Sequence, residues 1–399
     1  MSNASRTRTA MAATLSAGLM ATLPLDTLAA SEAELKAKIE QLERELAATR
    51  AELDEAKDTM DNANDLGPKK IELIDGKLKV GGAIRANYAI GDYPQSGSGG
   101  ASRAWEDGGD FGLDTFRINM DYADGPFLGK LEYRWYSGYN MLHTGWLGYQ
   151  FDDASQVQVG VNRVPFGPGA YGVSQSWFFD QHYYVGLADD MDLGVKYTTG
   201  VGDWTFDLGY YYSDEGNYKG TTEDSARYSY DIVNESGSGY EERNQFNVRG
   251  IYHLAGDVPT DLGFSLQYGQ LDSQGPQDDG DMFAGSLHMI NKWNNFTLAS
   301  QLTYYNIDVD AAQPLGTDTL VQYGAFDFPN TVATEAWIPA VSLSYYLATP
   351  SLPWLDYVIP YAEFSSIVKV SGEEMDVPTE PIPIIPRAKK KKAAPKAQA

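Results

Sequence analysis

Apolar and polar side chains alternate along residues 77–88, which read Lys77-Leu78-Lys79-Val80-Gly81-Gly82-Ala83-Ile84-Arg85-Ala86-Asn87-Tyr88. Successive side chains of a β-strand point to opposite faces, so this segment would have one apolar and one polar face. The apolar face would hold Leu78, Val80, Ile84 and Tyr88, and the polar face Lys77, Lys79, Arg85 and Asn87. Residues 115–122 repeat the pattern, which continues in segments of roughly ten residues from about Asp75 to Val370. The pattern predicts an all-β protein.

The apolar face of these segments is rich in Tyr, Trp and Phe, concentrated towards the expected strand ends. A soluble sandwich would bury a mostly aliphatic face. Aromatic girdles around a water-filled interior are instead typical of a sheet closed in lipid. We therefore predict a transmembrane antiparallel β-barrel over residues 67–370, with lipid and lipopolysaccharide as partners in the cell outer membrane. An exported β-sandwich binding protein is the alternative fold.

Composition excludes several other classes. The chain has 27 Tyr, 40 Gly and no Cys, which rules out disulfides, thiolate metal sites and a cysteine nucleophile. No run of 18 or more apolar residues occurs in the body of the chain, so no membrane helix is predicted there. A net charge of -25 argues against nucleic acid as a partner, because phosphate binding needs a basic surface.

The first 29 residues have the pattern of a secretory signal peptide. Arg6 and Arg8 precede a short apolar stretch from Ala10 to Leu23, and small residues follow near Ala29 and Ala30. Export from the cytoplasm is the expected consequence.

Residues 30–66 form a second, strongly charged segment that predicts an α-helical coiled coil. Ser31 and Glu34 have the spacing of a capping box. The apolar seam has alternating spacings of four and three and consists of Leu35, Ile39, Leu42, Leu46, Leu53 and Met60, with Thr49 and Ala56 as weaker members. About four heptads are too few for a stable lone helix, so we expect a periplasmic stalk that assembles a homotrimer. A solitary amphipathic helix lying on the barrel is the alternative.

Short connectors alternate with long ones along residues 67–370, as expected for periplasmic turns and outer loops. The short ones are residues 123–126, 152–155, 199–203, 255–261, 291–295 and 348–353. This count gives about thirteen strands, whereas a closed bacterial barrel needs an even number. Either closing strands are missing, or the count is wrong and the Pro- and Lys-rich residues 371–399 form a periplasmic arm. We expect this tail to be disordered.

Residues 159–167, Val159-Gly160-Val161-Asn162-Arg163-Val164-Pro165-Phe166-Gly167, are similar to the strand that leads into the third loop of Gram-negative outer-membrane porins. The chain resembles most closely their trimeric type with an N-terminal coiled coil, which includes phosphate-selective porins. The resemblance covers the signal, the stalk and the barrel and rests on pattern more than on identity. It implies sixteen strands and passive diffusion of small hydrophilic solutes. It also implies an inward-folded constriction loop at residues 168–190, with Tyr171, Trp177, Phe178, Phe179, Tyr183 and Tyr184 packed inside.

The alternation along each expected strand also predicts which residues contact lipid and which line the pore. Lipid would contact Leu78, Phe116, Leu131, Tyr133, Val157, Val159, Leu193, Val195, Phe206 and Leu208. The pore would be lined by the bases Lys77, Lys79, Arg85, Arg117, Lys130, Arg134, Lys196 and Arg249, and by the acids Asp121, Glu132, Asp192, Asp207 and Glu363. Arg163 is out of phase and would line the pore through a bulge or at the rim. The basic excess predicts a weak preference for anions, including phosphate. If these bases pair with the acids instead, a non-selective or sugar-passing porin is the alternative.

No residue pattern predicts an enzyme, a cofactor or a metal site. The four histidines lack ligand spacing, and no Gly-x-Ser-x-Gly elbow is present. Two acidic clusters, Asp189-Asp190 with Asp192 and Asp278-Asp279 with Asp281, have oxygen ligands suited to a divalent cation. Such clusters at loop tips are more often solvated or bridged to lipopolysaccharide, so the expectation remains no metal. An outer-membrane hydrolase is the enzymatic alternative.

Overall fold

The computed structural model describes residues 71–89, 104–105, 108–136, 139–175, 180–216, 218, 220–235, 239–349, 351, 355 and 357–370. The expected signal peptide, coiled-coil seam and C-terminal tail lie outside these residues, as do Trp177, Phe178 and Phe179. Within the described ranges, no helix is long and apolar enough to cross a membrane.

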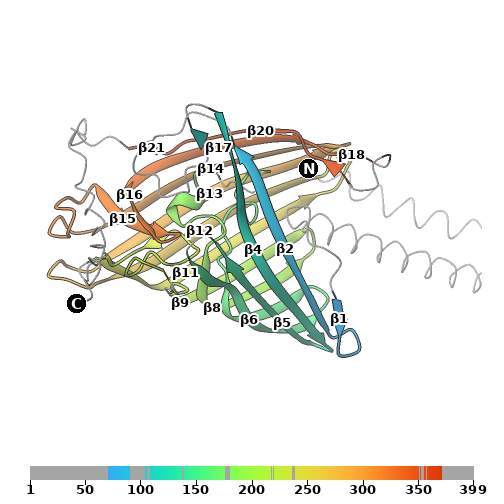
Figure 1. The fold of residues 1–399 in the computed structure, drawn as a ribbon, viewed down its shortest axis with the longest axis horizontal. Helices are drawn as coiled ribbons and strands as arrows, with labels where there is room; N and C mark the ends of the chain where they lie inside the picture. The colour runs from blue at the N-terminus through green and yellow to red at the C-terminus, as the bar shows by residue number, and fades with distance from the viewer. Residues whose placement is uncertain are drawn as a thin grey trace, which may run out of the picture. The chain divides into compact units, whose positions relative to one another are not determined.

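One antiparallel sheet of 16 strands contains most of the described residues. Its long strands are β2 (Leu78–Ala89), β4 (Gly108–Asp124), β5 (Phe127–Trp135), β6 (Asn140–Asp152), β7 (Ser155–Arg163), β8 (Met191–Val201), β9 (Trp204–Ser213), β11 (Tyr240–Leu254), β12 (Thr260–Ser273), β13 (Gly280–Trp293), β14 (Phe296–Asp308) and β17 (Glu335–Tyr345). The short ones are β1 (Ile71–Leu73), β3 (Ala104–Trp105), β20 (Tyr361–Ser365) and β21 (Val368–Lys369). The long strands pair in chain order, as Figure 1 shows.

The two ends of this sheet differ from the expected closed barrel. β20 and β21 both pair with β17, so together they occupy one position next to it. With the twelve long strands and the short β1 beside β2, the sheet has fourteen positions in its described part. This is one more than the count from the sequence, which did not include β1. In the described part of the chain, no ladder joins β20 or β21 to β1 or β2, so the sheet has two edges there. The β20 ladder is short, from Tyr361 to Ser365.

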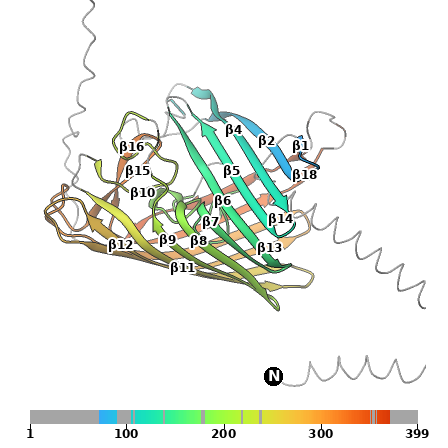
Figure 2. The ribbon, with the colours of Figure 1, turned by 90° about the horizontal axis from the view of Figure 1, so that it is seen from below.

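Three further strands and one short helix lie on one side of the large sheet. β10 (Asp231–Ile232), β15 (Leu320–Ala325) and β16 (Phe328–Ala333) form a separate small sheet, and η1 (Tyr183–Val185) is a single turn. Figure 2 shows this small sheet on the inner side of the curved large sheet. The long connections between β9 and β11 and between β14 and β17 therefore contain strands of their own. A further pair, β18 (Leu347–Ala348) and β19 (Tyr357–Val358), lies outside both sheets.

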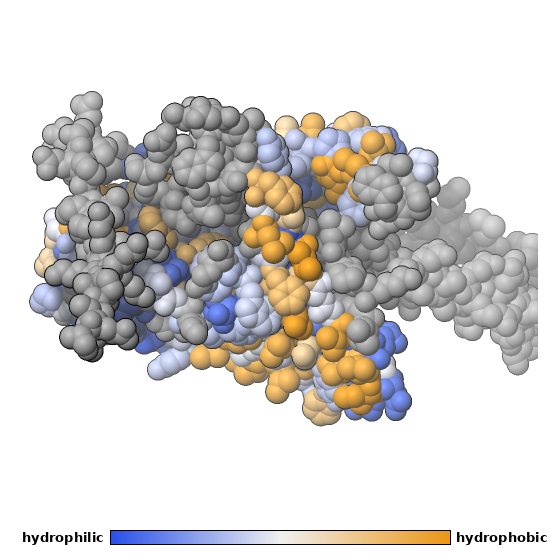
Figure 3. All heavy atoms as spheres, viewed as in Figure 1, coloured by the Kyte–Doolittle hydropathy of each residue, from blue (hydrophilic) through white to orange (hydrophobic). Residues whose placement is uncertain are grey.

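The two faces of the large sheet have opposite polarity. In β12, Leu266 is 47% exposed, whereas the preceding residue, Ser265, has its side chain on the other face and is fully buried. In β14, Leu302 is exposed between the buried polar residues Gln301 and Thr303. Of the residues expected to contact lipid, Phe116, Leu131, Val159, Leu193, Val195 and Leu208 are exposed, and Leu78, Tyr133, Val157 and Phe206 are half-buried. Figure 3 shows apolar side chains gathered on the front of the sheet, where β2 and β4 run.

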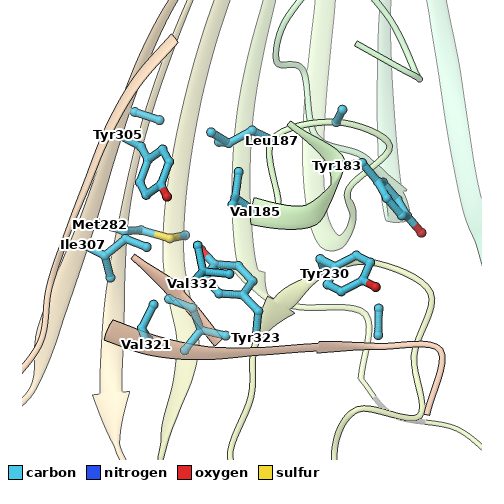
Figure 4. Close-up of a cluster of buried hydrophobic side chains, with 14 of the residues drawn as sticks. Tyr183, Val185, Leu187, Tyr230, Met282, Tyr305, Ile307, Val321, Tyr323 and Val332 are labelled. Carbon is cyan, nitrogen blue, oxygen red and sulfur yellow. The ribbon is translucent and has the colours of Figure 1, made fainter. Parts of the chain in front are cut away.

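A hydrophobic core lies on the inner side, where the small sheet and η1 meet the large sheet. Val185, at the end of η1, and Leu187 are buried together with Tyr230 and with Tyr323 of β15 (Figure 4). Side chains of the large sheet that join them include Met282, Tyr305 and Ile307. This core holds η1 and the small sheet against the inner face of the large sheet.

Candidate functional site

The chain between β7 and β8 crosses the inner face of the large sheet. We call its described residues, 164–175 and 180–190, the inner segment. Its first anchor is Gly167, whose backbone N–H donates a hydrogen bond of 3.0 Å to Ser265 Oγ on β12. Arg249 Nη1 on β11 donates to the Gly167 carbonyl oxygen at 3.3 Å. Gly167 has a φ of +66°, a conformation that favours glycine and turns the chain inward directly after β7.

Further anchors carry the inner segment to the far edge of the sheet. His182 Nε2 lies 2.8 Å from Thr303 Oγ1 on β14. Ser342 Oγ on β17 donates to the Val173 carbonyl oxygen. Ser174 Oγ donates to Glu363 on β20 at 3.0 Å, so the segment spans from β7 to β20. These contacts hold the described residues of the inner segment against the inner face of the large sheet.

The expected aromatic residues of this loop have different surroundings. Tyr183 is buried, and its hydroxyl donates to the Tyr228 carbonyl oxygen at 2.9 Å. Tyr184 is half-buried with its ring centroid 5.2 Å from that of Tyr230. Tyr171 is half-buried near the arginines described next. The two neighbours Tyr183 and Tyr184 thus hold the inner segment against the loop that carries Tyr228 and Tyr230.

Three of the predicted pore-lining residues meet on β4 and β5. Arg117 and Arg134 face each other across the ladder. Both contact Glu132 Oε1, Arg134 through Nε at 2.5 Å and Arg117 through Nη1 at 3.4 Å. All three side chains are nearly buried, and His143 Nδ1 lies 3.5 Å from the same carboxylate oxygen. Glu132 thus forms ion pairs with both arginines.

Arg163 pairs with Asp189 at the other end of the inner segment. Its Nε and Nη2 each lie 2.8 Å from Asp189 Oδ1, although the Arg163 side chain remains 41% exposed. Tyr228 donates its hydroxyl to Asp189 Oδ2 at 2.5 Å, and His143 Nε2 lies 3.4 Å from the same oxygen. Burial alone would raise the pKa of Asp189, but Arg163 and His143 bring this pKa below its usual value.

Lys196 and Arg249 form a second basic group further along the sheet. Arg249 Nη2 lies 2.7 Å from Asp207 Oδ2 across the β9–β11 ladder. Lys196 Nζ donates to the Arg163 carbonyl oxygen at 2.7 Å. Thr198 Oγ1 donates to the second oxygen of Asp207, so this carboxylate is bonded on both oxygens.

The remaining predicted bases lie away from this centre. Lys77 pairs with Asp124 at 2.9 Å, Lys79 with Glu72 at 3.8 Å and Lys130 with Asp121 at 3.8 Å. Their side chains are between about one third and one half exposed, and Arg85 is half-buried on β2. The structure therefore separates the predicted set into a buried centre and an exposed group at strand ends.

One predicted residue has a different role from the one expected. Asp192 does not pair with a base among the described residues: Gln245 Nε2 donates to its Oδ2 at 3.2 Å, and Asp190 and Asp231 lie beside it. Asp189, Asp190 and Asp192 are all buried rather than solvated, because Tyr228, Ser229 and Asp231 contact this stretch. His143 and Tyr228 were not predicted as site residues. His143 lies at a β-bulge in the β5–β6 ladder, where the regular alternation of faces is interrupted, so the sequence pattern did not place it. No pattern in the sequence around Tyr228 marks that residue as part of a site.

Comparison with solved structures found partial overlaps. OmpT of Vibrio cholerae, described as outer-membrane expressed, is 14% identical over 75% of this chain and 90% of its own, with a TM-score of 0.38. The outer-membrane channel DcaP of Acinetobacter baumannii is 11% identical over 75% and 82%, with a TM-score of 0.43. An anion-selective porin from Comamonas acidovorans is 13% identical over 73% and 94%, with a TM-score of 0.25. No protein-family model matches the chain, and no curated protein matches it.

Proposed function

We propose that this chain is an outer-membrane porin that lets small hydrophilic solutes and ions diffuse through a water-filled β-barrel. The observation that carries this proposal is the reversed polarity of the large sheet, with apolar side chains exposed and polar ones buried. A soluble sheet would expose its polar face, because large exposed apolar patches promote association. In lipid the same arrangement is stable. The inner segment, anchored from β7 to β20, supports a constriction across the pore.

We further propose a weak preference for anions, including phosphate. The centre of the inner face holds five bases, Arg117, Arg134, Arg163, Lys196 and Arg249, against three acids, Glu132, Asp189 and Asp207. Fixed positive charges that line a narrow pore raise the local concentration of anions. Because the excess is only two charges, the preference is weak.

A general porin is the second candidate, and a specific observation favours it. Most predicted bases contact a carboxylate, so their fields are partly cancelled. A non-selective or sugar-passing pore would follow if this cancellation were complete. The sign of the reversal potential in a salt gradient distinguishes the two candidates.

The assembly that we propose is a homotrimer held by a periplasmic coiled coil of residues 30–66, embedded in outer-membrane lipid and lipopolysaccharide. The heptad seam supports it. The function needs neither a catalytic residue nor a cofactor. Cross-linking of the full chain in detergent tests the trimer: a three-chain band that is lost when Leu42 and Leu46 are changed to Asp supports the stalk, and an unchanged band contradicts it.

Planar-bilayer recording of the detergent-purified chain tests the pore itself. Stepwise conductance with a reversal potential of anion sign is expected. Folded protein that gives conductance of cation sign would contradict the anion preference but not the pore. Esterase activity without conductance would favour the hydrolase alternative.

A further inference from the structure

Three buried carboxylates converge where β8, β10 and the end of the inner segment meet. Asp190, Asp192 and Asp231 are 4%, 2% and 1% exposed. Each offers a carboxylate oxygen, and these oxygens all lie within 4.8 Å of one another. Charged groups this deep in a protein carry a large desolvation cost unless they are compensated. The arrangement therefore needs compensation, either by a bound cation or by bound protons.

Several oxygens of this cluster lack a hydrogen-bond partner. Asp190 Oδ1, Asp192 Oδ1 and Glu215 Oε2 are buried without one. The second oxygens of two of these groups are held in place: Asp192 Oδ2 accepts from Gln245 at 3.2 Å, and Glu215 Oε1 accepts from the backbone N–H of Ser229 at 2.9 Å. Asp192 and Glu215 thus each have one oxygen held by a hydrogen bond and one buried oxygen that can bind another group.

Nearby side chains do not supply the missing charge to Asp190 and Asp192. Arg227 is buried against the cluster, but its ion pairs are with Asp214 at 2.7 Å, with Asp231 at 2.8 Å and with Asp224. Among the ion pairs between described residues, none includes Asp190 or Asp192. Glu242, whose Oε1 accepts from the Ile232 N–H at 2.8 Å, adds a further carboxylate.

We propose that Asp190, Asp192 and Asp231 bind a divalent cation, Ca²⁺, with Glu215 as an additional ligand. Oxygens up to about 4.8 Å apart can share one ion, because Ca–O distances are roughly 2.3–2.6 Å. The cluster consists of carboxylates alone, which hard cations prefer, whereas Zn²⁺ prefers nitrogen and sulfur. The buried, unpartnered oxygens distinguish this cluster from the exposed acids at Asp278 and Asp279.

Such an ion would join three stretches that are far apart in the chain. Asp190 ends the inner segment, Glu215 follows β9, and Asp231 lies in β10 of the small sheet. Ca²⁺ would therefore fasten the return of the inner segment to the loop between β9 and β11. This role is separate from conduction, and its test does not depend on whether the protein forms a pore.

The experiment measures Ca²⁺ binding by the full mature chain, purified in detergent with chelator and then dialysed. Tb³⁺ replaces Ca²⁺ as a luminescent probe, since Tyr211 and Tyr323 lie close enough to these carboxylates to sensitise it. Thermal unfolding is followed in parallel. We expect Tb³⁺ luminescence that Ca²⁺ displaces, and an unfolding midpoint that Ca²⁺ raises by several degrees.

The double variant Asp190→Asn, Asp192→Asn keeps side-chain shape and removes two ligand charges. It should lose about tenfold or more of its affinity for Tb³⁺ and Ca²⁺, and Ca²⁺ should no longer raise its midpoint. The matched control, Asp278→Asn with Asp279→Asn, should behave as the parent. If parent and Asp190/Asp192 variant respond equally to Ca²⁺, or if the parent does not respond, the proposal is wrong. If the double variant does not fold, Glu215→Gln takes its place with the same expected loss.

Discussion

Gly167 and Ser265 lie 98 residues apart in the chain, and the Gly167 N–H donates a hydrogen bond of 3.0 Å to the fully buried Ser265 Oγ. This bond is the first anchor of the inner segment after β7. Ser265→Ala leaves a buried backbone donor without a partner, which costs about 1–3 kcal/mol. We expect the urea midpoint of unfolding in detergent to fall and protease cleavage within residues 164–190 to become faster.

The control for this variant is Ser300→Ala on β14, where the half-buried serine lies on the opposite face of the sheet next to Val341. It should leave both readouts within error of the parent. Equal effects of the two substitutions would contradict the anchoring role of Ser265.

Gly160 is the position in β7 least able to accept a side chain. Its φ is +128°, and a Cβ would lie 2.3 Å from the Gly145 carbonyl oxygen. Gly160→Ala should therefore cost about 3 kcal/mol or more and reduce the fraction of protein that migrates as a heat-modifiable folded band. Gly169→Ala is the matched control, because a Cβ there meets nothing within 4 Å. A folded fraction for Gly160→Ala equal to that of Gly169→Ala would refute this reading.

Much of the large sheet could be predicted from local sequence. The turn expected at residues 123–126 separates β4, ending at Asp124, from β5, beginning at Phe127. The turn expected at residues 152–155 separates β6 from β7 in the same way. Alternation over about ten residues is a strong local signal, and Gly, Asp and Pro mark the breaks. These two signals give thirteen of the fourteen strand positions and miss the three-residue β1.

The inner side of the sheet could not be predicted in this way. The strands β10, β15 and β16 are short, and their burial depends on contacts with η1 and the large sheet rather than on their own pattern. The sequence Asp189-Asp190-Met191-Asp192 is typical of a solvated loop tip. It is buried because Tyr228, Ser229 and Asp231, which come later in the chain, contact it. Closure of the sheet is expected from the resemblance to porins and is not seen in the described ladders.

The carboxylate cluster should make stability depend on pH when divalent cations are removed. Burial first, and then neighbouring acids, raise the pKa values of Asp190 and Glu215 well above their usual range. A carboxyl that binds its proton more tightly when folded stabilises the protein below its unfolded pKa of about 4, and this contribution is lost as pH rises towards the folded pKa. The charged groups that act on them are Asp192, Asp231, Glu242 and Arg227.

In chelator, the free energy of unfolding should therefore increase as pH falls from about 8 to about 5. Glu215→Gln should flatten this dependence, whereas the exposed Asp278→Asn should not. Urea unfolding at a series of pH values measures both. If the free energy of unfolding changes with pH by the same amount in the parent, in Glu215→Gln and in Asp278→Asn, groups other than Glu215 cause the pH dependence.

Lys196 tests the origin of the proposed anion preference. Its Nζ is held by the Arg163 carbonyl oxygen, in the group that also contains Arg249 and Asp207. Lys196→Gln removes one charge from the inner face while keeping a hydrogen-bond donor, so the reversal potential in a KCl gradient should move towards the cation side. Lys369→Gln on the exposed β21 should leave it unchanged. A shift of equal size in both variants would mean that the charge of the inner face does not set selectivity.

Single-channel recording of the detergent-purified mature chain in a planar bilayer under a KCl gradient is the most direct test of the porin proposal. We expect stepwise conductance, in triplets of equal steps if the protein is a trimer, with a small reversal potential of anion sign. Protein that migrates as a folded, heat-modifiable band and yet gives no conductance would contradict the proposal that this sheet surrounds a water-filled pore.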